Sequence, residues 1–143
     1  MKKSRLVMVG NGMAGVRSLE ELLKIAPDLY DITVFGAEPH PNYNRILLSP
    51  VLAGEQTIDE IILNDWQWYA DNHITLHTGF TVTDVDRVHR AVHATNAAGE
   101  TITAEYDRLI LATGSNPFIL PIPGKELQGV LAYRDIADTQ AMI

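Results

Sequence analysis

The sequence predicts an α/β domain in which a mostly parallel sheet carries an antiparallel meander as an insertion. Two observations lead to this prediction. A short apolar run, a glycine-rich turn, a helical pattern and a second apolar run follow one another at the start, and several alternating segments come later. Strand, helix and strand in succession is the unit from which parallel sheets are built. Alternation of apolar and polar residues is instead typical of strands with one face in water.

Length and composition favour one globular domain. The chain has 143 residues, 46% of them hydrophobic, which is enough for a packed core. A net charge of −7 argues against nucleic-acid binding, because that affinity depends on clustered Lys and Arg. No stretch is long enough to span a bilayer, and the first apolar run is too short for a signal peptide. We therefore expect a cytoplasmic protein without membrane or nucleic-acid partners.

Residues 5–38 predict a βαβ unit. Arg5 to Val9 is a short apolar run that ends at Gly10, as buried parallel strands often do. From Met13 to Ile25 apolar residues recur every three or four positions, which indicates a helix that ends before Pro27. Asp31 to Phe35 is rich in β-branched and aromatic residues and predicts the second strand.

Residues 39–73 predict a loop followed by short helices. The stretch from Pro39 to Pro50 holds three of the seven prolines and two asparagines, which favours an ordered loop without regular structure. Thr57 and Glu60 then fit a capping box, in which a hydroxyl and a carboxylate bind free amides at a helix start. We expect helical pieces from there to Asp71.

Residues 74–106 predict a β-meander of four alternating strands. These strands are Ile74–His77, Val82–Asp86, Ala91–Thr95 and Thr101–Glu105. Residues 107–143 begin with the pattern of a buried strand from Arg108 to Gly114, and three prolines then force an extended exit. Tyr133 to Ile143 starts another helix and ends in mid-pattern, so we expect the chain to be the N-terminal part of a longer one.

The glycine-rich turn matches the G-x-G-x-x-G pattern that opens the helix of dinucleotide-binding Rossmann units. Its residues are Gly10, Asn11, Gly12, Met13, Ala14 and Gly15. Gly10 allows the tight turn, Gly12 lets a pyrophosphate approach the backbone, and Gly15 lets helix and strand pack closely. The free amides and the dipole at the helix start favour the anion. The pattern alone is weak evidence, but its position between a strand and a helix strengthens it.

Three further features lie at strand ends or in the loop after them. Glu38 ends the second strand, where a carboxylate can accept hydrogen bonds from a ribose; an exposed loop glutamate is the alternative. Arg45 can bind phosphate through charge-assisted hydrogen bonds worth about 1.5–3 kcal/mol, or it can be a solvated loop arginine. Ala112 to Gly114 end another apolar strand and are expected at the same sheet edge, although an ordinary tight turn has the same sequence.

Other reactive groups give no catalytic or metal site. The chain has no cysteine, which excludes a redox disulfide, a thiolate metal site and a cysteine nucleophile. His89 and His93 are spaced as helical metal ligands but lie in the predicted meander, so we assign no metal. Trp66, Trp68 and Tyr69 are expected to pack in a core or against a neighbouring domain rather than to stack on a ring.

With these motifs in this order, the chain resembles the FAD/NAD(P)-binding pyridine-nucleotide oxidoreductases over almost all of its length. Within that superfamily, residues 35–49 are most similar to the start of the large subunits of NAD(P)H-dependent assimilatory nitrite reductases. Rubredoxin and ferredoxin reductases are close relatives. Ferredoxin reductases commonly carry lysine where Pro50 stands here, which argues against a close match to them.

The resemblance implies roles for the candidate residues. Gly10 to Gly15 would hold the FAD pyrophosphate, Glu38 the adenosine ribose and Arg45 the phosphates. The backbone of Val82 would meet the adenine, and Thr113 with Gly114 would border the flavin. The resemblance further implies that NAD(P)H, siroheme and an iron–sulfur cluster bind only to later parts of the parent polypeptide. The rest of that polypeptide would be the main partner, with homo-oligomers also open.

Three functions fit these residues. The first is the FAD-binding part of a nitrite reductase that passes electrons from NAD(P)H through FAD to siroheme, the fragment alone being inactive. The second is a flavoprotein reductase of the rubredoxin or ferredoxin type. The third is a nucleotide-sensing Rossmann module without catalysis, although such a module would not need the meander and the second glycine-containing strand end.

Overall fold

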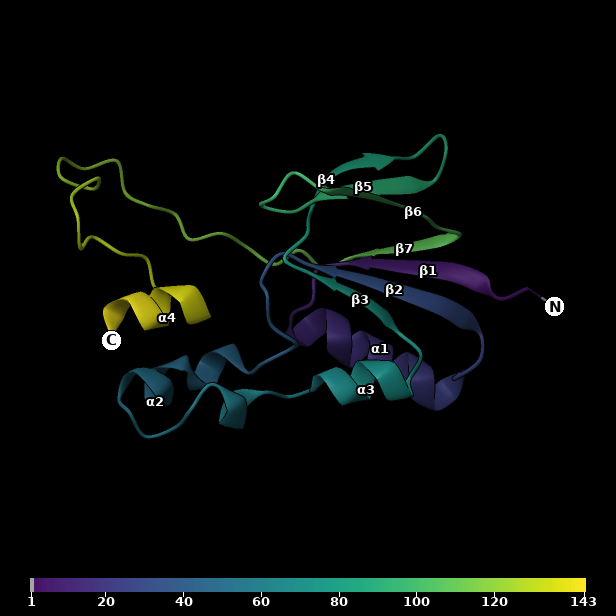
Figure 1. Ribbon diagram of the computed structural model, residues 1–143, viewed down its shortest axis with the longest axis horizontal. Helices are drawn as coiled ribbons and strands as arrows, with labels where there is room; N and C mark the ends of the chain where they lie inside the picture. Colours follow the sequence, from purple (N-terminus) through teal and green to yellow (C-terminus); the bar gives the residue numbers. More distant parts are fainter. Residues whose placement is uncertain (1) are drawn as a thin grey trace. The chain divides into compact units, whose positions relative to one another are not determined.

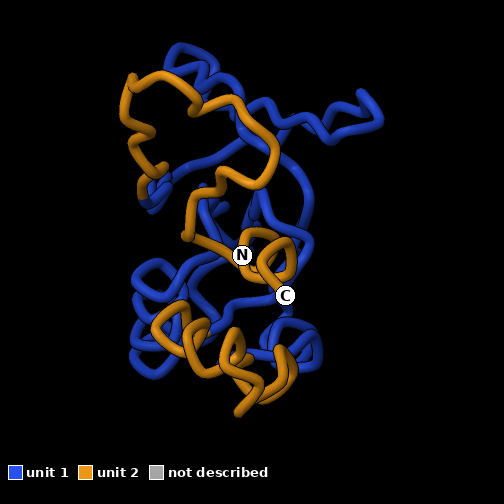
Figure 2. Tube along the Cα trace, turned by 90° about the vertical axis from the view of Figure 1, so that its left-hand side faces the viewer, with its two compact units in different colours: residues 1–43, 63–114 blue, residues 44–62, 115–143 orange. Residues whose placement is uncertain are grey.

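The computed structural model describes residues 2–143 and divides the chain into two compact units (Figure 2). Unit 1 comprises Met1–Tyr43 and Leu63–Gly114, with Met1 outside the described residues, and unit 2 comprises Asn44–Ile62 and Ser115–Ile143. Residues 44–62 and the tail of the chain together form unit 2, and the prediction of one domain stays a prediction. Two segments far apart in the sequence form this unit because helix α2 (Leu48–Leu52) and helix α4 (Ile136–Met142) pack together.

The predicted βαβ unit is confirmed, with boundaries that differ by no more than one residue. Strand β1 is Ser4–Val9, helix α1 is Met13–Ile25 and strand β2 is Tyr30–Gly36. β1 and β2 pair in parallel, with Leu6 opposite Ile32 and Met8 opposite Val34. Both faces of these central strands are covered, which explains why they are almost continuously apolar.

The main sheet has four parallel strands in the order β3-β2-β1-β7. Here β3 is Thr75–Thr78 and β7 is Arg108–Leu111. The same order begins the doubly wound dinucleotide-binding folds, so the Rossmann-like prediction is confirmed. The interpretation of residues 74–77 as a meander strand is wrong, because this segment pairs in parallel with β2. Four alternating residues fit an edge strand of either kind of sheet.

The antiparallel meander therefore has three strands, in the order β4-β5-β6. They are β4 (Thr81–Asp86), β5 (Ala91–Thr95) and β6 (Thr101–Glu105), and they agree with the prediction within one residue. Figure 1 shows this meander on one face of the main sheet and helices α1 and α3 (Trp66–Asp71) on the other. Unit 1 is thus a three-layer arrangement of helices, parallel sheet and meander.

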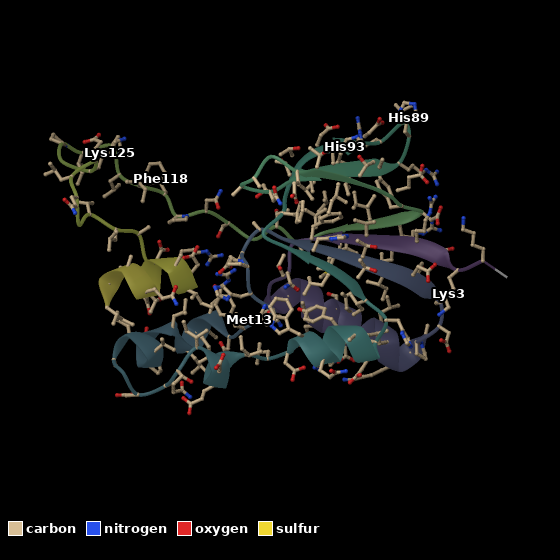
Figure 3. All side chains as sticks on the ribbon, in the orientation of Figure 1. Lys3, Met13, His89, His93, Phe118 and Lys125 are labelled. Atoms are coloured by element: carbon tan, nitrogen blue, oxygen red, sulfur yellow. The ribbon has the colours of Figure 1, made fainter. Side chains whose placement is uncertain are left out.

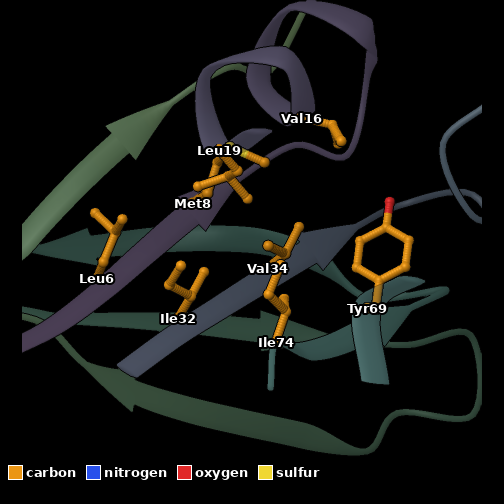
Figure 4. Packing of buried hydrophobic residues seen from close by; sticks show 8 residues of the cluster. All are labelled: Leu6, Met8, Val16, Leu19, Ile32, Val34, Tyr69 and Ile74. Carbon is orange, nitrogen blue, oxygen red and sulfur yellow. The ribbon is translucent and has the colours of Figure 1, made fainter. Parts of the chain in front are cut away.

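Two hydrophobic cores lie on the two faces of the main sheet, because successive side chains of a strand point to opposite sides. Leu6 and Met8 of β1 face the helices, and Val7 and Val9 face the meander. Figure 4 shows the helix-side core, whose buried members are Leu6, Met8, Val16, Leu19, Ile32, Val34, Tyr69 and Ile74. The meander-side core is built from Val7, Val9, Phe35, Val92, Ala94 and Tyr106.

The prediction of an irregular loop from Pro39 to Pro50 is wrong in its second half. A 3-10 turn at Arg45–Leu47 leads directly into helix α2, Leu48–Leu52. Pro50 is the third residue of α2, where a missing N–H costs nothing because the first amides of a helix have no intrahelical partner. The loop prediction assumed that these prolines exclude a helix. Proline in the first turn of a helix does not exclude it.

The later helices form in short pieces, as predicted. Thr57 and Glu60 make both bonds of the capping box, at 2.7 Å and 3.3 Å, beside the 3-10 turn Asp59–Ile61. Helix α4 is Ile136–Met142 and begins three residues later than predicted. The delay occurs because Asp135 and Asp138 form a capping box that fixes the start of α4.

Strand β7 is shorter and less buried than its apolar sequence predicts. It ends at Leu111, whose side chain is 64% exposed, and Ala112 to Gly114 lie beyond the strand. β7 is an edge strand of the sheet in residues 2–143, so one of its flanks has no strand beside it. Apolar composition alone does not distinguish such an edge strand from a central one.

Arg5 and Asp107 join the starts of β1 and β7. The Arg5 amide donates to Asp107 Oδ2 at 2.7 Å, and its guanidinium donates to both carboxylate oxygens at 3.2 Å. These hydrogen bonds from Arg5 lower the pKa of Asp107 from 3.8 to about 2. A carboxylate whose folded pKa is depressed stabilises the fold above its unfolded pKa, and this stabilisation is lost as the pH falls through the folded value.

We expect Asp107→Asn to lower the free energy of unfolding at neutral pH, by an amount that shrinks between pH 4 and pH 2. Urea unfolding of both proteins at several pH values measures this difference. The pair is partly exposed, so the difference should also shrink in high salt. A difference that stays constant through this pH window would contradict the assigned ion pair.

None of the helices within residues 2–143 is long and apolar enough to cross a membrane.

Candidate functional site

The carboxyl ends of β2, β1 and β7 meet at one edge of the main sheet. β2, the next strand along the chain, pairs with one side of β1, and β7 pairs with the opposite side of β1. The strand order therefore reverses at β1, and open α/β sheets bind their ligands in the crevice at such a switch point. The glycine-rich turn follows β1 at this edge, Glu38 follows β2, and Ala112 to Gly114 follow β7.

Gly10 is required by the fold itself. Its φ of +107° is rare for residues with a side chain, and an added Cβ would lie 2.0 Å from the carbonyl oxygen of Ala112. The Gly10 amide donates to the Phe35 carbonyl oxygen at 2.8 Å, and the Ala112 amide donates to the Val9 carbonyl oxygen at 2.8 Å. Gly10 therefore ties the ends of β2, β1 and β7 together.

Gly15 is required by close packing between helix and sheet. A Cβ on Gly15 would lie 2.9 Å from both the Ala112 Cβ and the Met8 Sδ. This is the helix–strand approach that the sequence predicts for the third glycine of the motif. Gly15 thus brings the first turn of α1 onto the ends of β1 and β7.

Gly12 differs from the other two glycines, because no contact or backbone angle within residues 2–143 requires a glycine there. Its φ of −92° suits any residue, and no heavy atom lies within 4 Å of an added Cβ. Gly12 is the N-cap of α1 and makes no side-chain cap. The first bond of the helix runs from the Val16 amide to the Gly12 carbonyl oxygen, so the amides of Met13, Ala14 and Gly15 lie outside the helical ladder.

The start of α1 is therefore suited to an anion. The helix has 13 residues and no acidic residue in its first turn, so its dipole is not offset there. Free amides and a positive helix end together favour phosphate, and the open space at Gly12 allows close approach. The residues present thus fit a pyrophosphate group at this edge.

Asn11 is held by a buried hydrogen-bond network that the sequence did not predict. Its Oδ1 accepts from the Tyr69 hydroxyl at 2.6 Å, and its Nδ2 donates to the His40 carbonyl oxygen at 3.4 Å. The Tyr69 hydroxyl also accepts from the Asn42 amide at 3.2 Å. Tyr69 is only 2% exposed, and burial raises the pKa of its hydroxyl.

The network continues away from the glycine-rich turn to Glu20 on α1. Asn42 Nδ2 donates to Asn64 Oδ1 at 2.9 Å, and Asn64 Nδ2 donates to Glu20 Oε1 at 2.9 Å. The bond from Asn64 lowers the pKa of Glu20. Asn42 and Asn64 are both buried, so their mutual bond is needed to satisfy polar groups removed from water.

Among the three aromatic residues of the predicted helical pieces, Tyr69 and Trp68 pack on the helix-side core, as expected. Trp66 is instead 53% exposed. The sequence analysis missed this network, and the one signal that could have indicated it is the hydroxyl of Tyr69, because a buried tyrosine usually finds a hydrogen-bond partner.

Glu38 is half-buried two residues beyond β2, at the position that the sequence predicts for a ribose ligand. Its Oε2 accepts from the Tyr43 hydroxyl at 2.6 Å, which orients the carboxylate. The Gly79 amide donates to the Glu38 carbonyl oxygen at 3.2 Å, and the Phe80 amide donates to the Gly36 carbonyl oxygen at 3.1 Å. The turn before β4 is thereby fastened to the end of β2.

Val82 is the second residue of β4, the strand that follows this fastened turn. Its side chain packs against the meander-side core, and it pairs with Ala94 just before the register of β4 shifts. β4 is an edge strand of the three-stranded sheet, which leaves backbone groups on its outer side outside the sheet. A backbone contact to an adenine is compatible with this position and stays a prediction.

Ala112, Thr113 and Gly114 form the third part of the edge. Ala112 contacts the glycine-rich turn, whereas Thr113 and Gly114 are exposed. Gly114 has a φ of +67°, which favours glycine at this turn. The glycine-rich turn, Glu38 and residues 112–114 thus follow the carboxyl ends of neighbouring strands, and their roles toward a cofactor stay predictions.

Arg45 belongs to unit 2, and its role toward this edge stays a prediction. Within unit 2 it is half-buried in the 3-10 turn, and its Nη1 donates to the Arg134 carbonyl oxygen at 3.4 Å.

The histidines that suggested a metal have other neighbours. Figure 3 labels His89 and His93 on the meander. His89 Nδ1 lies 2.7 Å from Asp86 Oδ2, and His93 Nδ1 lies 2.9 Å from Thr103 Oγ1. Residues 2–143 contain no group of three or more His, Cys, Asp or Glu side chains that could hold a metal ion.

Comparison with known proteins agrees with the fold described above. The family model described as pyridine nucleotide-disulphide oxidoreductase matches residues 4–143. The chain belongs to this family. It has no cysteine, so none of its own residues can form the disulphide that the family description names.

Two relatives from Bacillus subtilis cover the whole chain. A nitrite reductase [NAD(P)H] is 58% identical over 143 residues, and an assimilatory nitrate reductase electron transfer subunit is 52% identical. The chain spans 17% and 18% of the lengths of these two proteins.

Among solved structures, the NADH:rubredoxin oxidoreductase of Clostridium acetobutylicum has a TM-score of 0.80 and 26% identity, covering 97% of this chain and 34% of its own.

Proposed function

We propose that these residues form the FAD-binding part of an NAD(P)H-dependent flavoprotein oxidoreductase. The observation that carries the proposal is Gly12, a glycine that the protein itself does not need, at the start of a helix whose first amides lie outside its ladder. A ligand with a diphosphate group explains both features. The family membership supports a nucleotide cofactor at this position.

Each group of residues at the edge would bind a different part of the cofactor. Gly10 to Gly15 would hold the pyrophosphate, with Arg45 supplying positive charge to it. Glu38, oriented by Tyr43, would accept hydrogen bonds from the adenosine ribose, and Val82 would contact the adenine through its backbone. Thr113 and Gly114 would border the flavin at the end of β7.

Bound FAD would supply the redox chemistry, because a flavin accepts a hydride from NAD(P)H and releases electrons onward. The chain's own residues bind and orient the cofactor. None of the residues assigned to the edge is a catalytic acid, base or nucleophile, so their contribution is position and electrostatics. We propose that the NAD(P)H site lies in other parts of the whole protein.

We further propose that the whole protein is a nitrite reductase, in which electrons pass from NAD(P)H through FAD to a siroheme and iron–sulfur centre. The 58% identity to a nitrite reductase [NAD(P)H] over all 143 residues supports this assignment. Purified whole protein should consume nitrite with NADH or NADPH. Oxidation of the nicotinamide without nitrite consumption would contradict it.

A second candidate is a flavoprotein reductase that delivers electrons to rubredoxin or ferredoxin. The structural similarity to the NADH:rubredoxin oxidoreductase favours it. The same assay distinguishes the two functions when rubredoxin or ferredoxin replaces nitrite as the acceptor. Rapid reduction of either protein, with no turnover of nitrite, would establish the second candidate instead of the first.

The rest of the polypeptide is the proposed main partner of unit 2. The segment between Ser115 and α4 is irregular and carries several exposed apolar side chains (Figure 3, labelled Phe118). They include Phe118, Leu120, Ile122, Leu127 and Val130, each more than 50% exposed. Exposed apolar side chains gathered on one segment are typical of a surface that another part of a protein covers.

A further inference from the structure

Tyr69 lies at the centre of a polar network that no candidate role above requires. Its hydroxyl joins three segments of unit 1: the glycine-rich turn through Asn11, the loop after β2 through Asn42, and its own helix α3. The side chain is 2% exposed and belongs to the helix-side core, seen at the right of Figure 4. A leucine or phenylalanine would fill such a core position without any need for a polar partner.

The chemistry of these bonds leaves a single arrangement. The backbone amide of Asn42 can only donate, so the Tyr69 hydroxyl accepts from it and directs its single proton to Asn11 Oδ1. The His40 carbonyl oxygen can only accept, which places Asn11 Nδ2 on the opposite side. The hydroxyl keeps this proton at neutral pH, because the ordinary pKa of tyrosine is about 10 and burial raises the pKa of Tyr69 further.

The Cβ of Asn11 is also closely packed, in addition to the hydrogen bonds of its amide group. Its Cβ lies 2.9 Å from the position that a Cβ on Gly36 would take, so it packs tightly on the end of β2. Asn11 also stands between Gly10 and Gly12, the most conformationally free residues of the turn. A fixed side chain at this position restricts a turn that its two glycines would otherwise leave loose.

The far side of the network fixes Tyr69 in the same way. Asn64 donates to the Glu20 carboxylate, so its Oδ1 is directed to Asn42 Nδ2. Asn42 is thereby held in place and offers its backbone amide to Tyr69. A continuous chain of hydrogen bonds thus runs from α1 through the loop after β2 to the glycine-rich turn.

We infer that Tyr69 is a positioning residue for the glycine-rich turn. Through Asn11 its hydroxyl holds residues 10–12 in the conformation that presents the first amides of α1 to a phosphate group. The effect on ligand affinity rests on the proposed function, whereas the effect on the turn does not.

The test compares Tyr69→Phe with Tyr106→Phe, which makes the same substitution at a buried tyrosine of the meander-side core. Hydrogen exchange is measured at the amides of Asn11, Gly12 and Met13 and, for reference, in β1 and β2. We expect Tyr69→Phe to speed exchange in the turn about tenfold, because the hydrogen bond that holds Asn11 is lost. Exchange in the strands should change less, and Tyr106→Phe should leave the turn unchanged.

Affinity for FAD in the whole protein gives the second readout. We expect Tyr69→Phe to raise the Kd for FAD about tenfold, and by less than about twofold in an Asn11→Ala background, because both changes break the same link. An equal effect in both backgrounds, or unchanged exchange in the turn, would overturn the inference. If the unmutated protein binds no FAD, the proposed function fails, and the exchange comparison still decides the role of Tyr69.

Discussion

Replacing Gly12 with valine is expected to abolish retention of FAD while the protein still folds. The structure leaves open space around this position, and the backbone at Gly12 is allowed for any residue. Valine would therefore occupy the approach to the first amides of α1, and its Cβ would have no heavy atom of residues 2–143 within 4 Å. Loss of two charge-assisted hydrogen bonds, each worth about 1.5–3 kcal/mol, corresponds to a rise in Kd of at least about a hundredfold.

The stability cost of this change should be small. Valine is a poorer N-cap than glycine, and we expect about 1 kcal/mol. Ser18→Val is the matched control, because it places the same side chain on the exposed surface of α1 one turn after Ala14. Flavin content after purification and the thermal unfolding midpoint of each variant are the measurements. Full flavin occupancy in Gly12→Val would show that the ligand does not approach this glycine.

Replacing Gly10 with alanine is expected to destabilise unit 1 by about 3 kcal/mol or more. The added Cβ would lie 2.0 Å from the Ala112 carbonyl oxygen, and the φ of +107° is unfavourable for alanine. Because the collision is with backbone, the ends of β1 and β7 must separate. Any effect on FAD would then follow from damage to the fold, in contrast to Gly12.

Gly99→Ala is the control for the backbone conformation. Gly99 has a φ of +81° in the turn before β6, but no heavy atom lies within 4 Å of an added Cβ. Its cost should be about 1–2 kcal/mol, the ordinary penalty for alanine in a left-handed conformation. Urea unfolding measures the free energy of unfolding of both variants, and the difference between their losses gives the cost of the collision with Ala112. Equal losses of stability would contradict the close approach of Gly10 to Ala112.

The sequence predicted the βαβ unit accurately, because its signals are local. The helical periodicity of α1 and the apolar run of β1 each specify one kind of element. β3 was misassigned, because four alternating residues do not reveal that their partner is β2. Parallel pairing joins segments that are distant in the sequence, and a single sequence does not display it.

The sequence likewise predicted part of the candidate site and missed the rest. The glycine spacing identified the turn, yet the reasons for two of its glycines lie elsewhere: Ala112 is near Gly10 and Gly15 only in the fold. The network from Tyr69 to Asn11 was missed because asparagine and tyrosine at these spacings match no motif. Local chemistry predicts which residues can bind a phosphate, and the packing determines what holds them in place.

The other proposals depend on FAD binding at this edge of the sheet, in a protein that accepts hydride from NAD(P)H. The most direct test is the visible absorbance of the purified whole protein before and after anaerobic addition of NADH or NADPH. We expect a flavin spectrum that bleaches on addition, and FAD as the flavin released by denaturation. Absence of flavin, or oxidation of the nicotinamide without bleaching, would contradict it.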